Sequence, residues 1–294
     1  MSAAVEQVTA RTGSAGSQRR RRLAVRGGIL AVCSLYLAIL LIGPLIGIVS
    51  KALEGGVGLI PETLTSPEVR HAFYLTGVIT VQTLIVTTFF GVIVAWVLAR
   101  HRFVGRRFMN ALVDLPFAVS PVTVGLMAVL LFGTGGWFGD FFQARGIQIL
   151  FALPSMTLVT IFICIPFVIR EVQPVLEELG TEEEDAARTL GASSTRTFFR
   201  ITLPNVRWAL GYGIALSTAR AIGEIGAVLI VSGAIKGTTE TATIFVLTAF
   251  EERLDAQGNI VALTLAAVSV VLLVAIELFK RRGERLREKA SHGD

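Results

Sequence analysis

The sequence predicts an all-α membrane protein with six transmembrane helices, and three observations lead to this prediction. Hydrophobic residues make up 53% of the 294-residue chain and charged residues only 17%, against about 25% charged in an ordinary soluble protein. The mean hydropathy is +0.68. Long uncharged runs recur along the chain, and each is long enough to cross the hydrocarbon core of a bilayer. Because one soluble core could not absorb this much apolar sequence, the surplus must face lipid.

Six spans follow one another, and few charges interrupt them. The third span holds Asp114, and the fifth holds Arg220 and Glu224. We expect Asp114 to cap a helix break before Pro116 or to pair with an arginine of the inner surface. The six spans cover residues 27–50, 72–99, 108–133, 147–169, 208–233 and 260–279.

Lysine and arginine residues set the predicted orientation. Six spans put both termini on one side of the membrane. If that side is the cytoplasm, the inner segments hold 21 lysines and arginines and the outer segments five, in agreement with the positive-inside rule. The prediction is a multi-pass protein of the cell (inner) membrane with cytoplasmic N- and C-termini. The net charge of +5 is spread over these short segments, which favours membrane lipid over nucleic acid as the partner.

The spans and the basic segments divide the chain into four parts. These are a basic cytoplasmic tail, the first span with its outer loop, a core of five spans, and a second basic tail, covering residues 1–26, 27–71, 72–280 and 281–294. The core includes an outer loop, residues 234–259, whose apolar stretch 242–250 is too short to span. This stretch either forms an interfacial helix or a docking surface for an outside partner, or lies on the lipid headgroups as an amphipathic loop.

The inner loop, residues 170–206, has the pattern of a helix followed by a tight turn. Thr181 and Glu184 have the spacing of a capping box, and residues 182–185 place four carboxylates at the positive end of the helix. Gly191 suits the position after the helix, where a left-handed conformation costs glycine nothing. The small side chains of Ala186 and Ala187 would let another surface approach closely.

A second short helix is expected after the turn. Ser193 or Ser194 can cap it, and it carries Phe198, Phe199 and Ile201. Pro204 predicts a break before the fifth span. The resulting helix–turn–helix either docks another protein or simply packs under the bundle.

This loop resembles a known motif. Asp185-Ala186-Ala187, three residues, Gly191, nine residues, and then Ile201-x-Leu203-Pro204 is similar to the EAA loop of ABC-importer permeases, with Asp185 in place of the family's glutamate. The resemblance implies the type I ABC importer permease (MetI-like) fold. It also implies that the seven motif residues form a coupling helix that sits in a cleft of a separate ATPase subunit.

A narrower resemblance extends over about residues 70–280. In this region the sequence is similar to the sulfate/thiosulfate importer permeases, and among them to the CysW type. The matching residues are 189–192, 201–205, 207–210, 219–227 and 231–233. The resemblance implies import of sulfate and thiosulfate by alternating access. The implied partners are a CysT-like second permease as a heterodimer, two ATP-binding subunits that hold ATP and Mg, and an external sulfate-binding protein. The alternatives are a permease for another oxyanion such as molybdate and a free-standing secondary anion transporter.

Features of an enzyme are missing from the sequence. There is no Gly-Lys dipeptide and so no phosphate-binding loop, which predicts that no cofactor binds this chain and that ATP hydrolysis belongs to a partner. No set of side chains forms a catalytic constellation or has metal-ligand spacing, and the two cysteines cannot form a disulfide framework.

Arg220 and Glu224 are the most unusual residues of the spans. At a spacing of four they share one helix face and can pair across one turn. Charges in hydrocarbon are costly, so the pair should face the bundle interior or a wet cavity. Either Arg220 gives a sulfate dianion a favourable surface along its path, with Glu224 limiting how tightly it is held, or the pair is a structural salt bridge that fixes helix register or a permease interface.

Overall fold

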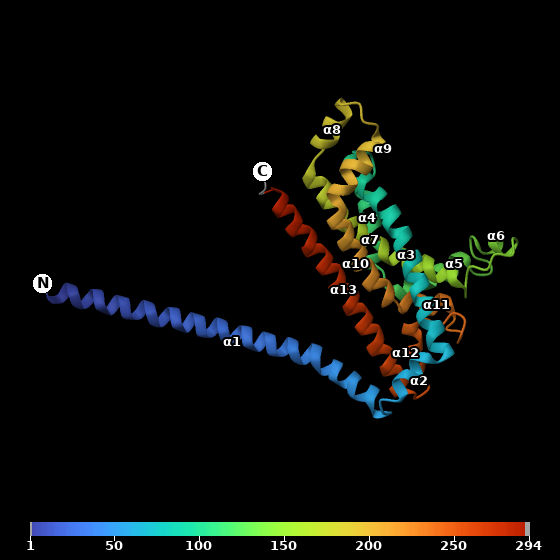
Figure 1. Cartoon of the computed structure of the whole chain (residues 1–294), viewed down its shortest axis with the longest axis horizontal. Coiled ribbons are helices and arrows are strands. Elements are labelled where there is room, and N and C mark those ends of the chain that lie inside the picture. Colours follow the sequence, from blue (N-terminus) through green and yellow to red (C-terminus); the bar gives the residue numbers. More distant parts are fainter. Residues whose placement is uncertain (1, 292–294) are drawn as a thin grey trace.

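The computed structural model describes residues 2–291, and every regular element in that part of the chain is helical (Figure 1). The all-α prediction is therefore confirmed. In chain order the elements are α1 (Ser2–Glu54), α2 (Leu59–Thr65), α3 (Pro67–Arg100), α4 (Arg106–Ala118), α5 (Pro121–Phe132), α6 (Gly139–Gln143), α7 (Leu153–Leu179), α8 (Glu182–Thr189), α9 (Ser194–Thr197), the π-helix η1 (Phe198–Thr202), α10 (Leu203–Ile222), α11 (Gly226–Ser232), α12 (Ala242–Glu251) and α13 (Asp255–Ser291).

Within the described residues 2–291, four helices are long and apolar enough to cross a membrane, and two bent pairs bring the number of spans to as many as six. The four lie in α1, α3, α7 and α13. The third and fifth predicted spans are not single helices, which corrects the sequence analysis. α4 and α5 meet at 110°, and the continuous helix from Ser194 to Ile222 meets α11 at 53°.

Local chemistry explains the first bend. Ser120 precedes Pro121 and adopts an extended conformation, as residues before proline do, so α4 cannot continue into α5. The fourth span is also shifted, since α7 begins at Leu153 and not at residue 147. Residues 147–152, before α7, contact α11 instead: the Phe151 N–H donates to the Val231 carbonyl at 2.8 Å.

The centre of the bundle is a close crossing of α3, α7 and α10. A methyl group added to Gly91 of α3 would lie 2.8 Å from the Val168 Cβ, and one added to Gly213 of α10 would lie 3.0 Å from the Val168 Cα. Two small residues therefore let both helices approach α7 at one fully buried valine.

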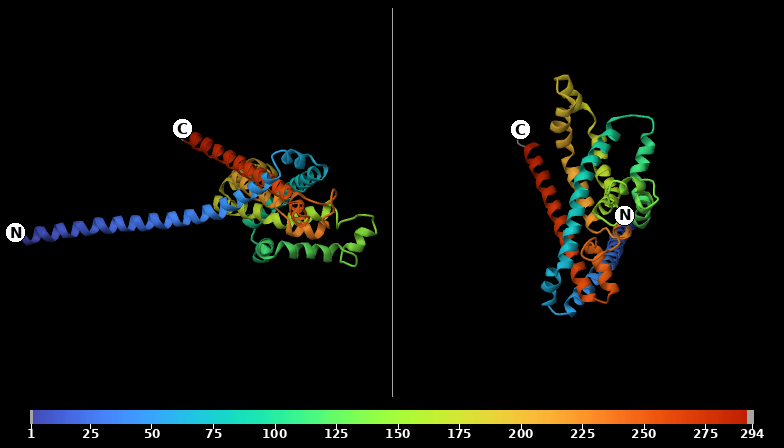
Figure 2. Two further views of the ribbon diagram at one scale, coloured as in Figure 1. Left: turned by 90° about the horizontal axis from the view of Figure 1, so that it is seen from below. Right: turned by 90° about the vertical axis from the view of Figure 1, so that its right-hand side faces the viewer.

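The two ends of the bundle carry different elements. α8 and α9 lie at one end, and α2 and α12 lie at the other (Figures 1 and 2). α12 packs Ala242, Phe245 and Ala249 against α3 and α13, so the apolar stretch of the outer loop is part of the core. The segment is helical, as one of the predicted alternatives stated, and not an irregular loop.

The terminal helices are longer than predicted. α1 leaves the bundle and contacts α13 near its own C-terminal end, and its apolar window is 0% buried (Figure 2). It is helical over residues 2–26 as well, where the sequence suggested only a basic tail. α13 likewise continues to Ser291, while residue 1 and residues 292–294 of the two tails lie outside the described residues.

Candidate functional site

The segment from the end of α7 to the start of α10 forms a helical hairpin. We call residues 180–204 the coupling loop, after the role that the sequence resemblance implies. Gly180 and Gly191 have φ angles of +64° and +82°, in the left-handed region that favours glycine. The Ala192 N–H donates to the Ala187 carbonyl at 3.0 Å, closing the end of α8. The predicted role of Gly191 as the residue after the helix is confirmed.

The predicted capping box is wrong. The Thr181 side chain makes no capping hydrogen bond, and Glu184 turns away from the start of α8 into the bundle. Its Oε1 lies 3.1 Å from Nε and Nη2 of Arg100, at the end of α3, and accepts from the Thr202 hydroxyl at 2.9 Å. Sequence reasoning missed this role of Glu184, because four carboxylates stand side by side and only the fold decides which one is buried.

The second half of the coupling loop begins as predicted and continues differently. Ser193 caps α9 through the Arg196 N–H. Phe198 turns inward, with its ring centroid 6.1 Å from that of Trp96 on α3. Pro204 does not break the helix, which corrects the sequence analysis. Pro204 lies inside the continuous helix from Ser194 to Ile222, and the wider turn of the π-helix η1 directly before it accommodates the residue that lacks an N–H.

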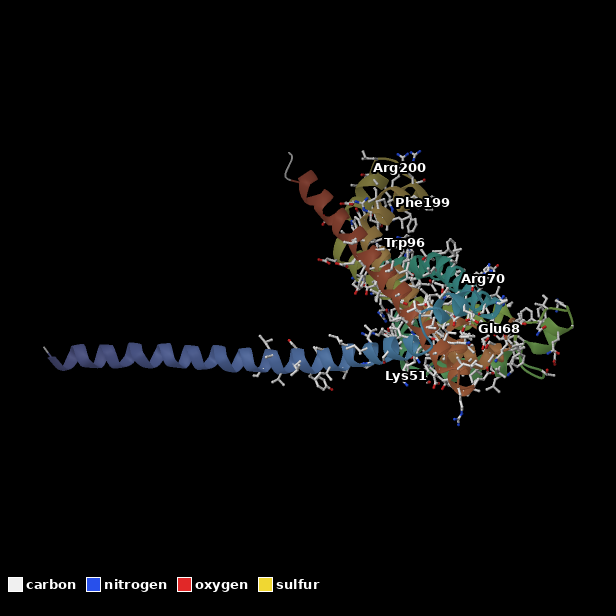
Figure 3. The ribbon with its side chains drawn as sticks, turned by 60° about the horizontal axis from the view of Figure 1, so that its bottom comes forward. Lys51, Glu68, Arg70, Trp96, Phe199 and Arg200 are labelled. Atoms are coloured by element: carbon white, nitrogen blue, oxygen red, sulfur yellow. The ribbon has the colours of Figure 1, made fainter. Side chains whose placement is uncertain are left out.

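The motif residues of the coupling loop are divided between surface and interior. Asp185, Ala186, Gly191 and Pro204 are exposed, whereas Ala187, Ile201 and Leu203 are half-buried. Two large apolar side chains of the coupling loop are also exposed to solvent: Leu190 is 88% exposed and Phe199 is 60% exposed. Phe199 and Arg200 lie together at this end of the molecule, beyond Trp96 (Figure 3). An exposed apolar patch with charged neighbours is typical of a protein interface.

Arg220 and Glu224 form the predicted ion pair, with Arg220 Nη1 2.5 Å from Glu224 Oε2. They do not share a helix, however, because Arg220 lies in the last turn of α10 and Glu224 in the break before α11. Glu224 Oε1 accepts from the Ala227 N–H at 2.8 Å, which satisfies a free donor at the start of α11. Glu224 is buried, while the Arg220 side chain is 30% exposed. The Glu224 carboxylate therefore stabilises the break between α10 and α11, and the Arg220 side chain is partly exposed.

The two breaks in the spans lie against each other. A methyl group added to Gly226, at the start of α11, would lie 3.0 Å from the Pro121 Cβ, at the start of α5. Asp114 of α4 does pair with an inner arginine, as one of its two predicted alternatives stated. Its carboxylate accepts from Arg170 Nε and Nη2 at 2.7 and 2.6 Å. Broken helices that meet inside a bundle are typical of substrate paths in transporters.

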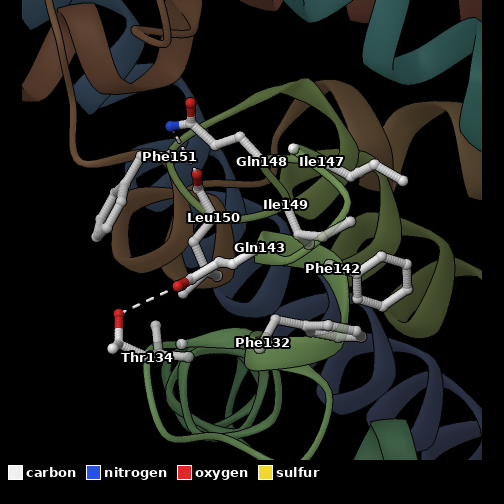
Figure 4. A pocket seen from close by; sticks show the side chains of 13 residues that line it. Phe132, Thr134, Phe142, Gln143, Ile147, Gln148, Ile149, Leu150 and Phe151 are labelled. Atoms are coloured by element: carbon white, nitrogen blue, oxygen red, sulfur yellow. Dashed lines mark hydrogen bonds between the residues drawn. The ribbon is translucent and has the colours of Figure 1, made fainter.

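A cavity of about 510 Å³ lies between α5, α6 and residues 146–151, which precede α7 (Figure 4). It is lined by aromatic and aliphatic side chains, among them Phe132 and Phe142. Gln143 Nε2 donates to the Thr134 hydroxyl at 3.3 Å across its edge. In the nearby outer loop, burial raises the pKa of the Glu240 carboxyl. Over the described residues, no group of three or more His, Cys, Asp or Glu is placed to hold a metal ion.

Comparison with known proteins gives close sequence relatives. The sequence model of the family described as "binding-protein-dependent transport system inner membrane component" matches residues 87–286. The chain is 44% identical over 254 residues to a sulfate transport system permease protein CysW of Synechocystis sp., covering 86% of this chain and 92% of that protein. It is 34% identical over 253 residues to a sulfate transport system permease protein CysT of Escherichia coli K12, covering 86% and 91%.

A solved structure shares the fold. It is a bacterial alginate ABC transporter in complex with an alginate pentasaccharide-bound periplasmic protein. One of its chains superposes with a TM-score of 0.75 and 16% identity, covering 89% of this chain and 96% of that one. This similarity confirms the predicted importer permease architecture.

Proposed function

The chain belongs to the family of binding-protein-dependent transport system inner membrane components, and from that membership we propose that it is the permease subunit of an ABC importer for sulfate. The observation that carries the substrate is the 44% identity to a CysW sulfate permease over most of both chains. The lower identity to a CysT permease, 34%, favours the CysW type for this chain and a CysT-like protein as its partner permease.

The proposed mechanism assigns ATP hydrolysis to separate subunits. Two ATPase subunits, which bind ATP and Mg, dock on the coupling loops of the two permeases, and their closure turns the path outward toward an external binding protein. The exposed motif residues Asp185, Ala186 and Gly191, beside the apolar Leu190 and Phe199, support the coupling loop as the docking surface. This mechanism requires the coupling loop and both termini to be cytoplasmic, in accord with the excess of basic residues there.

Arg220 is proposed to serve the anion on its way. Its side chain is partly exposed beside the break between α10 and α11, and Glu224 neutralises it. A dianion would be attracted by such an arginine without being trapped, because the carboxylate already shares the cation. Thiosulfate is a second proposed substrate, since it carries the same charge on a tetrahedral frame.

The proposed function is tested by uptake in proteoliposomes. The complete complex, with partner permease, ATPase subunits and binding protein, is reconstituted and given radiolabelled sulfate with and without ATP. We expect ATP-dependent uptake that excess thiosulfate blocks and excess molybdate leaves intact. Block by molybdate would favour a general oxyanion importer. ATP hydrolysis stimulated by the binding protein but without sulfate uptake would refute the substrate and retain the permease role.

A further inference from the structure

Two helices of the bundle, α3 and α7, meet two elements of the coupling loop, α8 and η1, at one buried guanidinium. Arg100 ends α3, and its Nη1 donates to the Leu176 carbonyl of α7 at 2.5 Å. The same guanidinium holds Glu184 of α8 at 3.1 Å, and Glu184 accepts from Thr202 of η1. The side chains of Arg100 and Glu184 are 8% and 5% exposed. We call Arg100, Glu184 and Thr202 the strut.

Packing alone does not hold α8 at this place. A cavity of about 240 Å³, lined in part by Trp96, Thr197 and Phe198, lies between the end of α3 and the coupling loop, and Arg100 and Glu184 form part of its wall. The outward side of α8 is exposed as well. Two carboxylates of α8 form hydrogen bonds with neighbouring helices: Glu183 accepts from Asn205 of α10 at 2.6 Å, and the buried Glu184 accepts from Arg100 and Thr202.

A buried ion pair is a costly way to stabilise a fold, because desolvation offsets much of its attraction, and well-packed apolar side chains often do as well. What such a pair supplies is a fixed geometry, since the planar guanidinium donates its hydrogen bonds only in certain directions. At this position the fixed geometry joins the surface that meets the ATPase to a helix that runs the whole length of the bundle.

We propose that the strut transmits displacement of the coupling loop to α3, so that Arg100 and Glu184 are positioning residues for transport. The inference rests on the proposed function. Without the strut, the ATPase still docks and hydrolyses ATP, but α8 moves relative to α3 and the spans do not follow.

The test separates transport from ATP hydrolysis in the reconstituted complex. Glu184→Gln keeps the shape and the acceptor for Thr202 but removes the charge. We expect ATP hydrolysis to remain within about twofold of wild type and sulfate moved per ATP to fall about fivefold or more. The matched control is Glu177→Gln. Glu177 lies on α7, outside the coupling loop, and its carboxylate pairs with Arg106 of α4 at 2.7 Å. This control should leave the ratio unchanged. An unchanged ratio in Glu184→Gln, or parallel loss of transport and hydrolysis, would overturn the proposal.

Two further measurements keep the test decisive. Arg100→Gln combined with Glu184→Gln leaves no unpaired buried charge, so it should fold even where the single variant does not. It should remain uncoupled, whereas a merely stabilising pair predicts a wild-type ratio. Spin labels at the exposed positions Thr189 and Arg102, with Cys33 replaced by serine, report the distance between α8 and the end of α3. We expect this distance to stay constant through the ATP cycle in wild type and to vary in Glu184→Gln. Variation in wild type would refute the strut, even in a complex that does not carry sulfate.

Discussion

Replacing Gly191 with valine tests the coupling loop through its backbone alone. A methyl group added at Gly191 meets no atom within 4 Å, so the chain itself has room for a larger side chain. The φ angle of +82° is the obstacle. A left-handed conformation costs an ordinary residue about 1–2 kcal/mol, and a β-branched residue is a genuine outlier there. A cost of about 2 kcal/mol lowers the population of the observed turn about 30-fold relative to relaxed turns.

The assay is ATP-dependent sulfate uptake by the reconstituted complex, together with the amount of the chain recovered in the membrane. We expect Gly191→Val to insert normally and to lose most uptake, because α8 no longer presents its exposed face in the observed geometry. The matched variant is Gly191→Asn. Asparagine tolerates the left-handed region, so it should retain much of the uptake although it is as bulky as valine.

Two results would refute this reasoning. Normal uptake by Gly191→Val would mean that the turn geometry is not needed for coupling. Equal loss in the asparagine and valine variants would mean that the space beside Gly191, and not its φ angle, matters to the docked ATPase.

Three further predictions concern the two breaks and the outer loop. In Gly125→Ala the new methyl would lie 2.8 Å from the Ile230 Cβ and 2.9 Å from the Ala227 carbonyl oxygen, so we expect a cost of about 1–3 kcal/mol and a Tm lower by about 3–10 °C. The control Gly77→Ala, inside α3 with open space around it, should not lower the Tm, because alanine favours the helix more than glycine does. Arg220→Gln combined with Glu224→Gln keeps the acceptor for α11, so the complex should assemble and transport sulfate about tenfold more slowly; unchanged uptake would make the pair purely structural. Because the folded state raises the pKa of Glu240, the stability gained by protonation is complete below the ordinary pKa of 4.5 and is lost as the pH rises through the folded value. Glu240→Gln should therefore melt above wild type at pH 7 and equally with it below pH 4.5, and a wild-type Tm at pH 7 would contradict this.

The number and order of the spans follow from hydropathy, but their shapes do not. Residues 108–133 and 208–233 are apolar enough to be called single spans, because hydropathy averages over a window and is blind to one or two residues that leave the helical region. The signals of a break were present in the Ser120–Pro121 pair and in the glycines on either side of Glu224. Their meaning depends on the two breaks meeting, which only the folded chain determines.

The site was predictable where its geometry is local. The left-handed Gly191 and the cap by Ser193 depend on neighbours within a few residues, and both were predicted. The role of Glu184 depends on Arg100, 84 residues away in the sequence, and no local pattern separates this carboxylate from Asp185 beside it. The spacing of a capping box was a plausible but wrong interpretation, because burial against a cation outweighed a local hydrogen bond.

The π-helix before Pro204 sets the rotational phase of everything that follows it. One additional residue in a helical turn rotates the rest of the helix by about 100° relative to an uninterrupted α-helix. The number of residues in η1 therefore determines which face of α10 carries Gly213 toward Val168. The nine residues between Gly191 and Ile201 include α9 and the first part of η1, so their number affects the rotation of α10 about its axis. Deleting a single residue from their helical part, residues 194–200, would change which side of α10 faces the centre of the bundle, so the length of this part is as constrained as its sequence.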